Sequence, residues 1–407
     1  MGTEVHPNGC TPATGWPMSV LVGGDQALLS EIRRIARDIA AVHADEVDHE
    51  ARFPREAVDA LREAGALSAY VPTELGGHGV SLETLAQACF ELARCCSATA
   101  MVFAMHQIQV VTIVRYLEGA PWFESYLRRQ AAEQRLIASV TSEIGTGGDN
   151  GRSIAPVTDA GDGALTLVKQ APTVSYGAHA DDLLTTARRS PDAEQVDQVL
   201  VLHHRDQTSL TLTGTWDTIG MRGTCSPGFE VSARFAPEQI LPAPFALVMN
   251  ETHVPITHIL WSHCWLGIAT EAFERGRGFV RAAARRNPGA PVPAAHSLSR
   301  VMGELAMLRS EVRSGLAEFQ AHDAEGREAL HTMSAILRFN NLKLAASEQT
   351  PRICMQVLEV IGIAAYKNDS PFGVGRQLRD ALSARLMVAN ERIHAFDAGL
   401  LMIAKEV

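Results

Sequence analysis

The most informative stretch of the chain is TWDTIGMRGTCS, residues 215–226. It lies in the middle of a sequence whose two ends have helical patterns. Alone, its Gly-Met-Arg-Gly run is equally compatible with a turn between two strands. Three other stretches occur with it, however: TSEIGTGGD at 141–149, KQAPTVSYGAHAD at 169–181, and Arg379-Asp380 after a glycine-containing loop at 362–375. The combination, in this order and spacing, is much more specific than any single stretch.

From about residue 25 to its end, the chain therefore resembles the acyl-CoA dehydrogenase family of FAD flavoproteins. The resemblance implies an α+β fold with an N-terminal helical domain, a central β domain and a C-terminal helical bundle. The apolar pattern agrees, with helical spacing at Leu28, Ile32 and Ile35 and β-branched or alternating runs at 165–169, 197–204 and 209–213. We expect a flexible leader at 1–24 and domains at 25–136, 137–248 and 249–407. Helices are predicted at 256–285, 294–322, 325–347, 351–361 and 377–404.

Composition restricts the possible partners. A formal charge of −10 over 407 residues argues against a nucleic-acid partner, because phosphate binding needs a basic face. No run of about 18 apolar residues indicates a membrane span, and the start lacks the pattern of a secretory signal. The seven cysteines show no paired zinc spacing, which predicts reduced thiols and no metal site. We expect a cytoplasmic protein.

The glycines at 145, 147 and 148 do not form a nicotinamide site. A Rossmann loop needs another glycine at position 150, where this chain has Asn150, and no strand–loop–helix unit surrounds the run. Electrons from NAD(P)H would then arrive through another protein, a separate flavin reductase.

The resemblance implies an FAD site between the β domain and the C-terminal helices. Ser175 would lie near flavin N5, although it could also be a plain strand-edge serine. Arg285 matches an arginine that grips the FAD pyrophosphate of a neighbouring subunit, a task that suits a guanidinium. The family's isoalloxazine contacts fall on Val140, Thr141, Ser142, Thr173, Val174 and Ser175, and its adenosine contacts fall on Gln356 and Gly362.

The catalytic glutamate of the family is missing. Its usual place, nine residues after Arg379, is Val388, and the place used by a minority of members is Thr257. With Gly148, these two positions would border the substrate pocket. Glu391 follows Val388 by three residues, which on a helix is about 60° round and ~4.5 Å along. It would serve as the base only after a backbone shift, and otherwise it pairs with Arg392 or solvent.

An oxygen-using branch of this fold lacks the glutamate and often has histidine and serine near the flavin. This chain offers His106, His258 and His263 in helices expected to face it. We therefore predict an FAD-dependent, homotetrameric enzyme that oxygenates a small substrate through a flavin C4a-(hydro)peroxide. The substrate would be a thioester on CoA or a carrier protein, or a free aromatic or amine compound. Two alternatives are an acyl thioester α,β-dehydrogenase, with Glu391 or a histidine as base, and a non-catalytic assembly protein.

Overall fold

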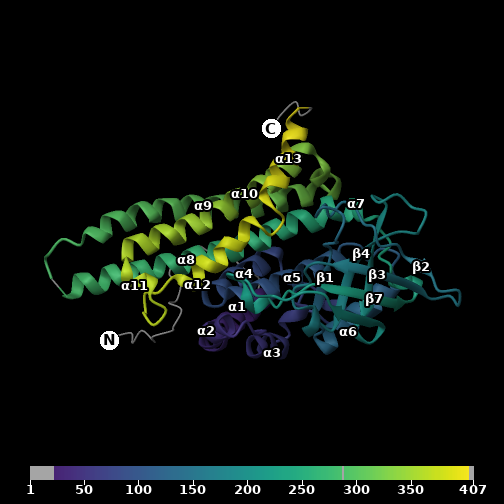
Figure 1. The fold of residues 1–407 in the computed structure, drawn as a ribbon, viewed down its shortest axis with the longest axis horizontal. Coiled ribbons are helices and arrows are strands. Elements are labelled where there is room, and N and C mark those ends of the chain that lie inside the picture. The colour runs from purple at the N-terminus through teal and green to yellow at the C-terminus, as the bar shows by residue number, and fades with distance from the viewer. Residues whose placement is uncertain (1–22, 287, 403–407) are drawn as a thin grey trace.

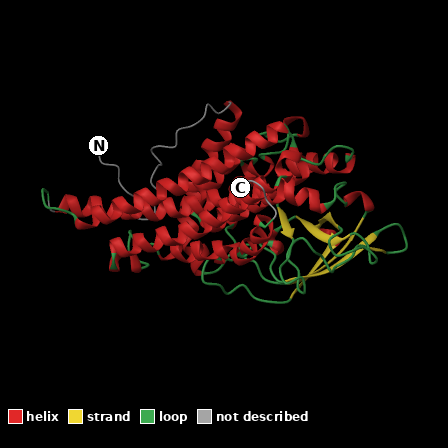
Figure 2. Cartoon of the chain, turned by 90° about the horizontal axis from the view of Figure 1, so that it is seen from above, coloured by secondary structure: helices red, strands yellow, loops and turns green. Residues whose placement is uncertain are grey.

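The computed structural model describes residues 23–286 and 288–402, so the expected leader lies outside the described residues except for its last two glycines. Within the described residues, helices come first and last and strands lie between them, in the predicted order. In Figure 1 the strands lie at one end of a long helical body, and the view from above in Figure 2 shows the same arrangement.

Six α-helices precede the strands. The one helix of the described residues that is long and apolar enough to span a membrane is α5, and 89% of that window is buried inside the protein. Its apolar surface on all sides is what a helix in the middle of a core requires. The helices are α1 (Gly23–Ile35), α2 (Ala41–His49), α3 (Arg55–Glu63), α4 (Leu82–Cys95), α5 (Ser97–Val114) and α6 (Pro121–Glu133).

The strands form two small sheets. One has the order β1-β4-β5 and the other β2-β3-β7-β6. Strand β1 runs parallel to β4, with Ile137 opposite Asp182, and the remaining pairs are antiparallel. The strands are β1 (Ile137–Val140), β2 (Thr158–Asp159), β3 (Leu165–Ala171), β4 (Asp182–Arg188), β5 (Gln198–His204), β6 (Thr208–Leu212) and β7 (Phe229–Phe235).

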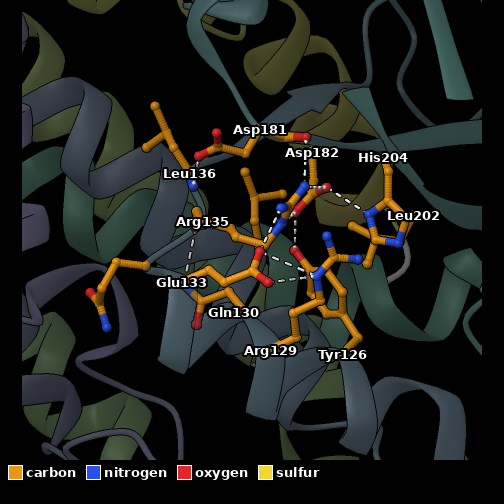
Figure 3. A network of polar contacts seen from close by, with 12 residues as sticks. Tyr126, Arg129, Gln130, Glu133, Arg135, Leu136, Asp181, Asp182, Leu202 and His204 are labelled. Atoms are coloured by element: carbon orange, nitrogen blue, oxygen red, sulfur yellow. Dashed lines mark hydrogen bonds and ion pairs between the residues drawn. The ribbon is translucent and has the colours of Figure 1, made fainter. Parts of the chain in front are cut away.

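A polar network fastens α6 to the first sheet (Figure 3). Asp182 is fully buried and accepts two hydrogen bonds of 2.7 Å from Arg135 and one of 2.8 Å from Tyr126. His204 Nδ1 lies 2.7 Å from the same carboxylate. Burial alone would raise the pKa of Asp182, but the Arg135 and His204 contacts outweigh it and the pKa is lowered. A buried charge is tolerated here because it is fully paired.

Long helices return after the short α7 (Phe245–Val248). Helices α8 and α10 pack on each other and α8 also packs on α4, so one continuous core joins the two ends of the chain. Figure 1 shows α8, α9 and α10 side by side. The C-terminal helices are α8 (Val254–Arg286), α9 (Pro293–Glu325), α10 (Met333–Ile361), α11 (Ile363–Tyr366), α12 (Gly375–Leu382) and α13 (Asn390–Leu401).

Two helix predictions are wrong. The predicted helices 325–347 and 351–361 are one helix, α10, with Pro351 inside it. Proline removes a backbone hydrogen bond at a cost of about 3 kcal/mol, which the packing of α10 against α8 and α9 outweighs. The predicted helix 377–404 is instead broken between α12 and α13, where Val388 has a φ of 52°. Val388 and Glu391 therefore do not share a helix.

Candidate functional site

The stretch 215–226 meets the Arg379-Asp380 pair directly. Met221 N donates to Asp380 Oδ1 at 2.7 Å, and a Cβ on Gly220 would overlap the Arg379 backbone. Arg379 in turn pairs with Asp48 of α2. Burial raises the pKa of Asp380. These five residues, which we call the clasp, join the N-terminal helices, the β region and α12.

The ends of β1 and β3 also come together, as expected for the isoalloxazine contacts. Val140 is buried at the end of β1, and Thr141 follows it. Ser142 Oγ donates to the carbonyl of Thr173 at 3.0 Å; Thr173 is exposed and Ser142 half-buried. Val174 is buried behind them. We call residues 140–142 and 173–175 the flavin edge because they are the predicted isoalloxazine contacts; buried Val140 and Val174 lie among its polar residues.

Ser175 belongs to a chain of hydroxyl groups. Ser226 Oγ donates to Ser175 Oγ at 2.9 Å, and Thr224 Oγ1 lies 2.8 Å from Ser226 Oγ. Because Ser175 accepts from Ser226, its own proton is available to a further acceptor. The sequence interpretation assigned no role to Ser226, although Ser226 closes the most informative stretch.

A buried ion pair supports the flavin edge from behind. Lys169 Nζ donates to Thr186 Oγ1 at 2.7 Å and to the Thr141 carbonyl at 3.3 Å, and Glu143 lies 3.6 Å away. Glu143 accepts the Ala155 N–H at 2.7 Å. Burial lowers the pKa of Lys169 to about 8, against the opposing effect of Glu143. Sequence reasoning missed this pair, because its two members lie in different segments.

The residues expected at the FAD pyrophosphate and adenosine lie in the C-terminal helical region. Arg285 is exposed at the far end of α8, 28 residues after Thr257, which is roughly 42 Å along a helix. Gln356 Nε2 donates to Glu304 Oε1 at 2.9 Å, and Gly362 ends α10 with a φ of 72°. The role of Arg285 at the FAD pyrophosphate of a neighbouring subunit stays a prediction.

At the position of the missing glutamate, a buried cation contacts the backbone of Val388. Lys343 is fully buried, and its Nζ donates to the Val388 carbonyl at 2.6 Å and also to Asn390 Oδ1. The same Nζ lies 6.0 Å above the ring of Trp265. Burial lowers the pKa of Lys343 to about 8. A β-branched residue at positive φ is strained, by about 1–3 kcal/mol, and needs such support. Nothing local in the sequence singles out Lys343.

Glu391 lies beyond this turn. It is exposed in the first turn of α13. Its neighbour Arg392 rests against Gly148, where a Cβ would overlap the guanidinium. The structure thus brings Gly148 to the start of α13, close in sequence to Val388, which is 37% exposed. The carboxylate of Glu391 therefore does not occupy the place that a side chain at residue 388 would take.

All three expected histidines contact backbone carbonyls. His106 uses both ring nitrogens, one 2.7 Å from the Leu67 carbonyl and one accepting the Ile137 N–H at 3.0 Å. His263 Nδ1 lies 2.8 Å from the Ile259 carbonyl of its own helix. Burial lowers the pKa of each to about 4, so both are neutral at pH 7. A role of His106 at the flavin stays a prediction that this geometry does not favour.

His258 is better placed. Its Nδ1 lies 3.0 Å from the Phe339 carbonyl, and only 3% of the residue is exposed. Burial and then the charge of Lys343 lower the pKa of His258 to about 3. A neutral imidazole that donates through Nδ1 keeps a lone pair on Nε2. His258 follows Thr257 in the sequence, and it lies near enough to Lys343 for that charge to lower its pKa.

Comparison with known sequences gives relatives of two chemical kinds. Residues 24–119 match the acyl-CoA dehydrogenase N-terminal domain. The amino sugar nitrososynthase DnmZ of Streptomyces peucetius is 26% identical over 84% of each chain. Cyclohex-1-ene-1-carbonyl-CoA dehydrogenase of Syntrophus aciditrophicus is 24% identical over 92% of this chain and 89% of the relative.

Solved structures show the same two kinds. FMN-bound TdsC from Paenibacillus sp. A11-2 is 19% identical, with a TM-score of 0.79 over 92% of this chain and 97% of that one. Butyryl-CoA dehydrogenase from Megasphaera elsdenii is also 19% identical, with a TM-score of 0.78 over 95% and 100%. The chain carries an acyl-CoA dehydrogenase N-terminal domain and has the acyl-CoA dehydrogenase-like fold, with both dehydrogenases and flavin monooxygenases among its relatives.

Proposed function

We propose that this chain is a flavin-dependent monooxygenase. The observation that carries the proposal is the turn at residue 388. Removal of a substrate α-proton needs a positioned base, which typically contributes ~10²–10⁴ in rate. Here the position has a valine whose carbonyl accepts from a buried ammonium group, and the alternative position is Thr257. A nearby cation stabilises negative charge that develops in the transition state.

The flavin edge fits a flavin ring. It offers exposed and half-buried polar groups from two segments that meet, and the Ser142–Thr173 hydrogen bond joins them. With O₂, a reduced flavin supplies an activated oxygen atom to its substrate. Ser175, oriented by Ser226, has a proton to donate at this edge. His258 and Lys343 contribute a neutral acceptor and a cation on the α8 side.

The names of some relatives support this assignment. Dibenzothiophene monooxygenase of Mycolicibacterium goodii and a probable FMNH2-dependent monooxygenase of Pseudomonas putida are among the matching sequences. The cofactor we propose is FAD, with FMN as the form to compare, since TdsC is seen with FMN. A separate flavin reductase, a cytoplasmic location and a homotetramer belong to the same proposal.

The substrate of the proposal is a small molecule, on a CoA or carrier-protein thioester or free as an aromatic or amine. The dehydrogenase alternative would use Glu391 or a histidine as base. Its specific support is the similarity to cyclohex-1-ene-1-carbonyl-CoA dehydrogenase. The exposed position of Glu391 beyond the strained turn argues against it.

The test separates these functions with one flavin-loaded sample. Under argon, butyryl-CoA should leave the oxidised flavin coloured. After chemical reduction, the protein is exposed to ¹⁸O₂ with indole as the first probe, because TdsC is seen with it. The product should be heavier than indole by the mass of one ¹⁸O atom. Anaerobic bleaching by butyryl-CoA would establish the dehydrogenase, and a protein that takes up no added flavin would establish the assembly protein.

A further inference from the structure

Three polar side chains of α8 form a stripe that the proposed function does not yet use. Thr257, Trp261 and Trp265 follow one another at intervals of four residues, so they lie on one face of the helix. The rings of Trp261 and Trp265 are 6.0 Å apart. The stripe begins at the predicted pocket position, Thr257, and ends against Lys343 Nζ, 6.0 Å above the Trp265 ring.

Each member of the stripe has a buried polar atom without a hydrogen-bond partner among the described residues. These atoms are Thr257 Oγ1, Trp261 Nε1 and Trp265 Nε1. Buried donors of this kind are rarely left unpaired, so three on one stripe require an explanation. Thr257 is 7% exposed and Trp261 8%, whereas Trp265 is fully buried. The outer two thus keep slight exposure, although their hydroxyl and indole N–H groups are themselves buried.

The chemistry of the stripe favours one kind of ligand atom. An indole N–H and an ammonium group donate hydrogen bonds and accept none. A threonine hydroxyl can also donate. Residues 254–268 of α8 include no acidic side chain that could receive a ligand's own donors. The wall therefore suits an acceptor oxygen, and it suits neither a bare hydrocarbon chain nor an unsubstituted aromatic ring.

We propose that Thr257 and Trp261, backed by Trp265 and Lys343, form a specificity wall that binds the substrate through an oxygen acceptor, a carbonyl or a carboxylate. The proposal rests on the monooxygenase function only in placing the reacting substrate beside this wall. It predicts that oxygen-bearing small molecules bind more tightly than oxygen-free ones such as indole, and it makes Trp261 N–H the principal donor.

Three probes of matched size test the wall: ethylbenzene, acetophenone and benzoate. Binding to the oxidised, flavin-loaded protein is measured by calorimetry, without turnover. A neutral hydrogen bond predicts that acetophenone binds about fivefold more tightly than ethylbenzene, and a charged acceptor predicts about tenfold or more for benzoate. The better of the two shows whether a neutral or an anionic oxygen is preferred.

Variants assign the preference to the wall. Trp261→Phe keeps an aromatic ring but removes the N–H, and Thr257→Val keeps the shape but removes the hydroxyl. Each should reduce the preference for the oxygen-bearing probe severalfold, with flavin content and melting temperature unchanged. Ser262→Ala is the matched control, because Ser262 Oγ is also buried without a partner among the described residues but lies off the stripe. It should leave the preference intact.

The wall proposal is overturned if ethylbenzene binds as tightly as both oxygen-bearing probes, if neither of those binds, or if the two variants leave the ratios unchanged. The ¹⁸O₂ experiment tests the monooxygenase function, and its result is independent of the binding tests of the wall. A protein that prefers oxygen-bearing probes but bleaches under argon with an acyl-CoA would retain the wall and lose the monooxygenase.

Discussion

Two parts of the C-terminal segment, eight residues apart, have opposite characters. At the clasp, Asp380 is buried and accepts the Met221 N–H, and Gly220 packs directly on the backbone beside it. At the turn, Val388 is partly exposed, strained, and supported by the buried Lys343. The clasp has the residues that the family resemblance leads one to expect, and the turn does not. Contacts that set the fold and groups that set the chemistry can thus vary independently on one short segment.

The largest expected effect is at the clasp. Gly220→Ala places a methyl group against the Arg379 backbone, which cannot move aside as a flexible side chain would. We expect a loss of roughly 3 kcal/mol in the free energy of unfolding, at the upper end for overpacking. Denaturant titration measures it. Gly214→Ala is the control, because the nearest atom to its Cβ is 3.8 Å away. Equal free energies of unfolding of the two variants would show that the close packing at the clasp does not stabilise the fold.

At the turn, Val388→Glu restores a carboxylate to the position of the family's base. We expect oxygenated product to fall about 100-fold, a typical effect of misplacing one group in a catalytic site, and slow flavin reduction by butyryl-CoA under argon to emerge. Product analysis and anaerobic absorbance give the two readings. Val388→Gln, of similar size without charge, should lose oxygenation without gaining reduction. Full oxygenation by Val388→Glu would place residue 388 away from the reacting atoms.

The cation of the turn predicts a pH dependence of stability. The folded pKa of Lys343 is lowered to about 8, below its unfolded value of about 10.4, so the unfolded state binds more protons between these limits. Stability contributed by this group therefore rises with pH across that window, by up to ~1.4 kcal/mol per pH unit. Lys343→Met should reduce that rise, measured by unfolding titrations at pH 8, 9 and 10. The pKa of Lys169 is also lowered to about 8, so this residue should maintain part of the rise in stability in the variant.

The cofactor side has a prediction of its own. If Arg285 of a second subunit contacts the FAD pyrophosphate, Arg285→Ala should weaken FAD about tenfold or more, because charge-assisted hydrogen bonds contribute ~1.5–3 kcal/mol. FMN lacks the second phosphate, so its affinity should change little. Fluorescence titration with both flavins provides the comparison. An unchanged FAD affinity would remove Arg285 from the site.

The smallest effect is expected at the hydroxyl chain. Ser226→Ala removes the group that orients Ser175, so the yield of oxygenated product should fall severalfold, about the value of one neutral hydrogen bond. Ser175→Ala should produce at least the same loss, and the double variant should add little, because the two act as one unit. Stopped-flow absorbance and product yield measure this. Additive losses would mean that the two serines act separately.

Several features of the site were readable from the sequence. Residues 215–226 and Arg379-Asp380 predicted the fold, and the solved structures of similar fold confirm it. The absent carboxylate at Val388 could be identified because the family resemblance gives that position by its distance in sequence from Arg379. The family resemblance implied that residues 140–142 and 173–175 lie together, and Ser142 Oγ does donate to the Thr173 carbonyl. Such features depend on local pattern and connectivity, which a linear sequence contains.

Only the tertiary structure placed Lys343 beside Val388, because residues 45 positions apart meet through the packing of α10 against the turn. The same holds for the continuation of α10 through Pro351 and for the backbone contacts that occupy both nitrogens of His106. Helix propensity is a weak local preference, whereas burial of a core and of its charges involves many distant groups at once. The sequence by itself determined which groups the chain has; long-range packing decided which of them are buried, paired and free to react.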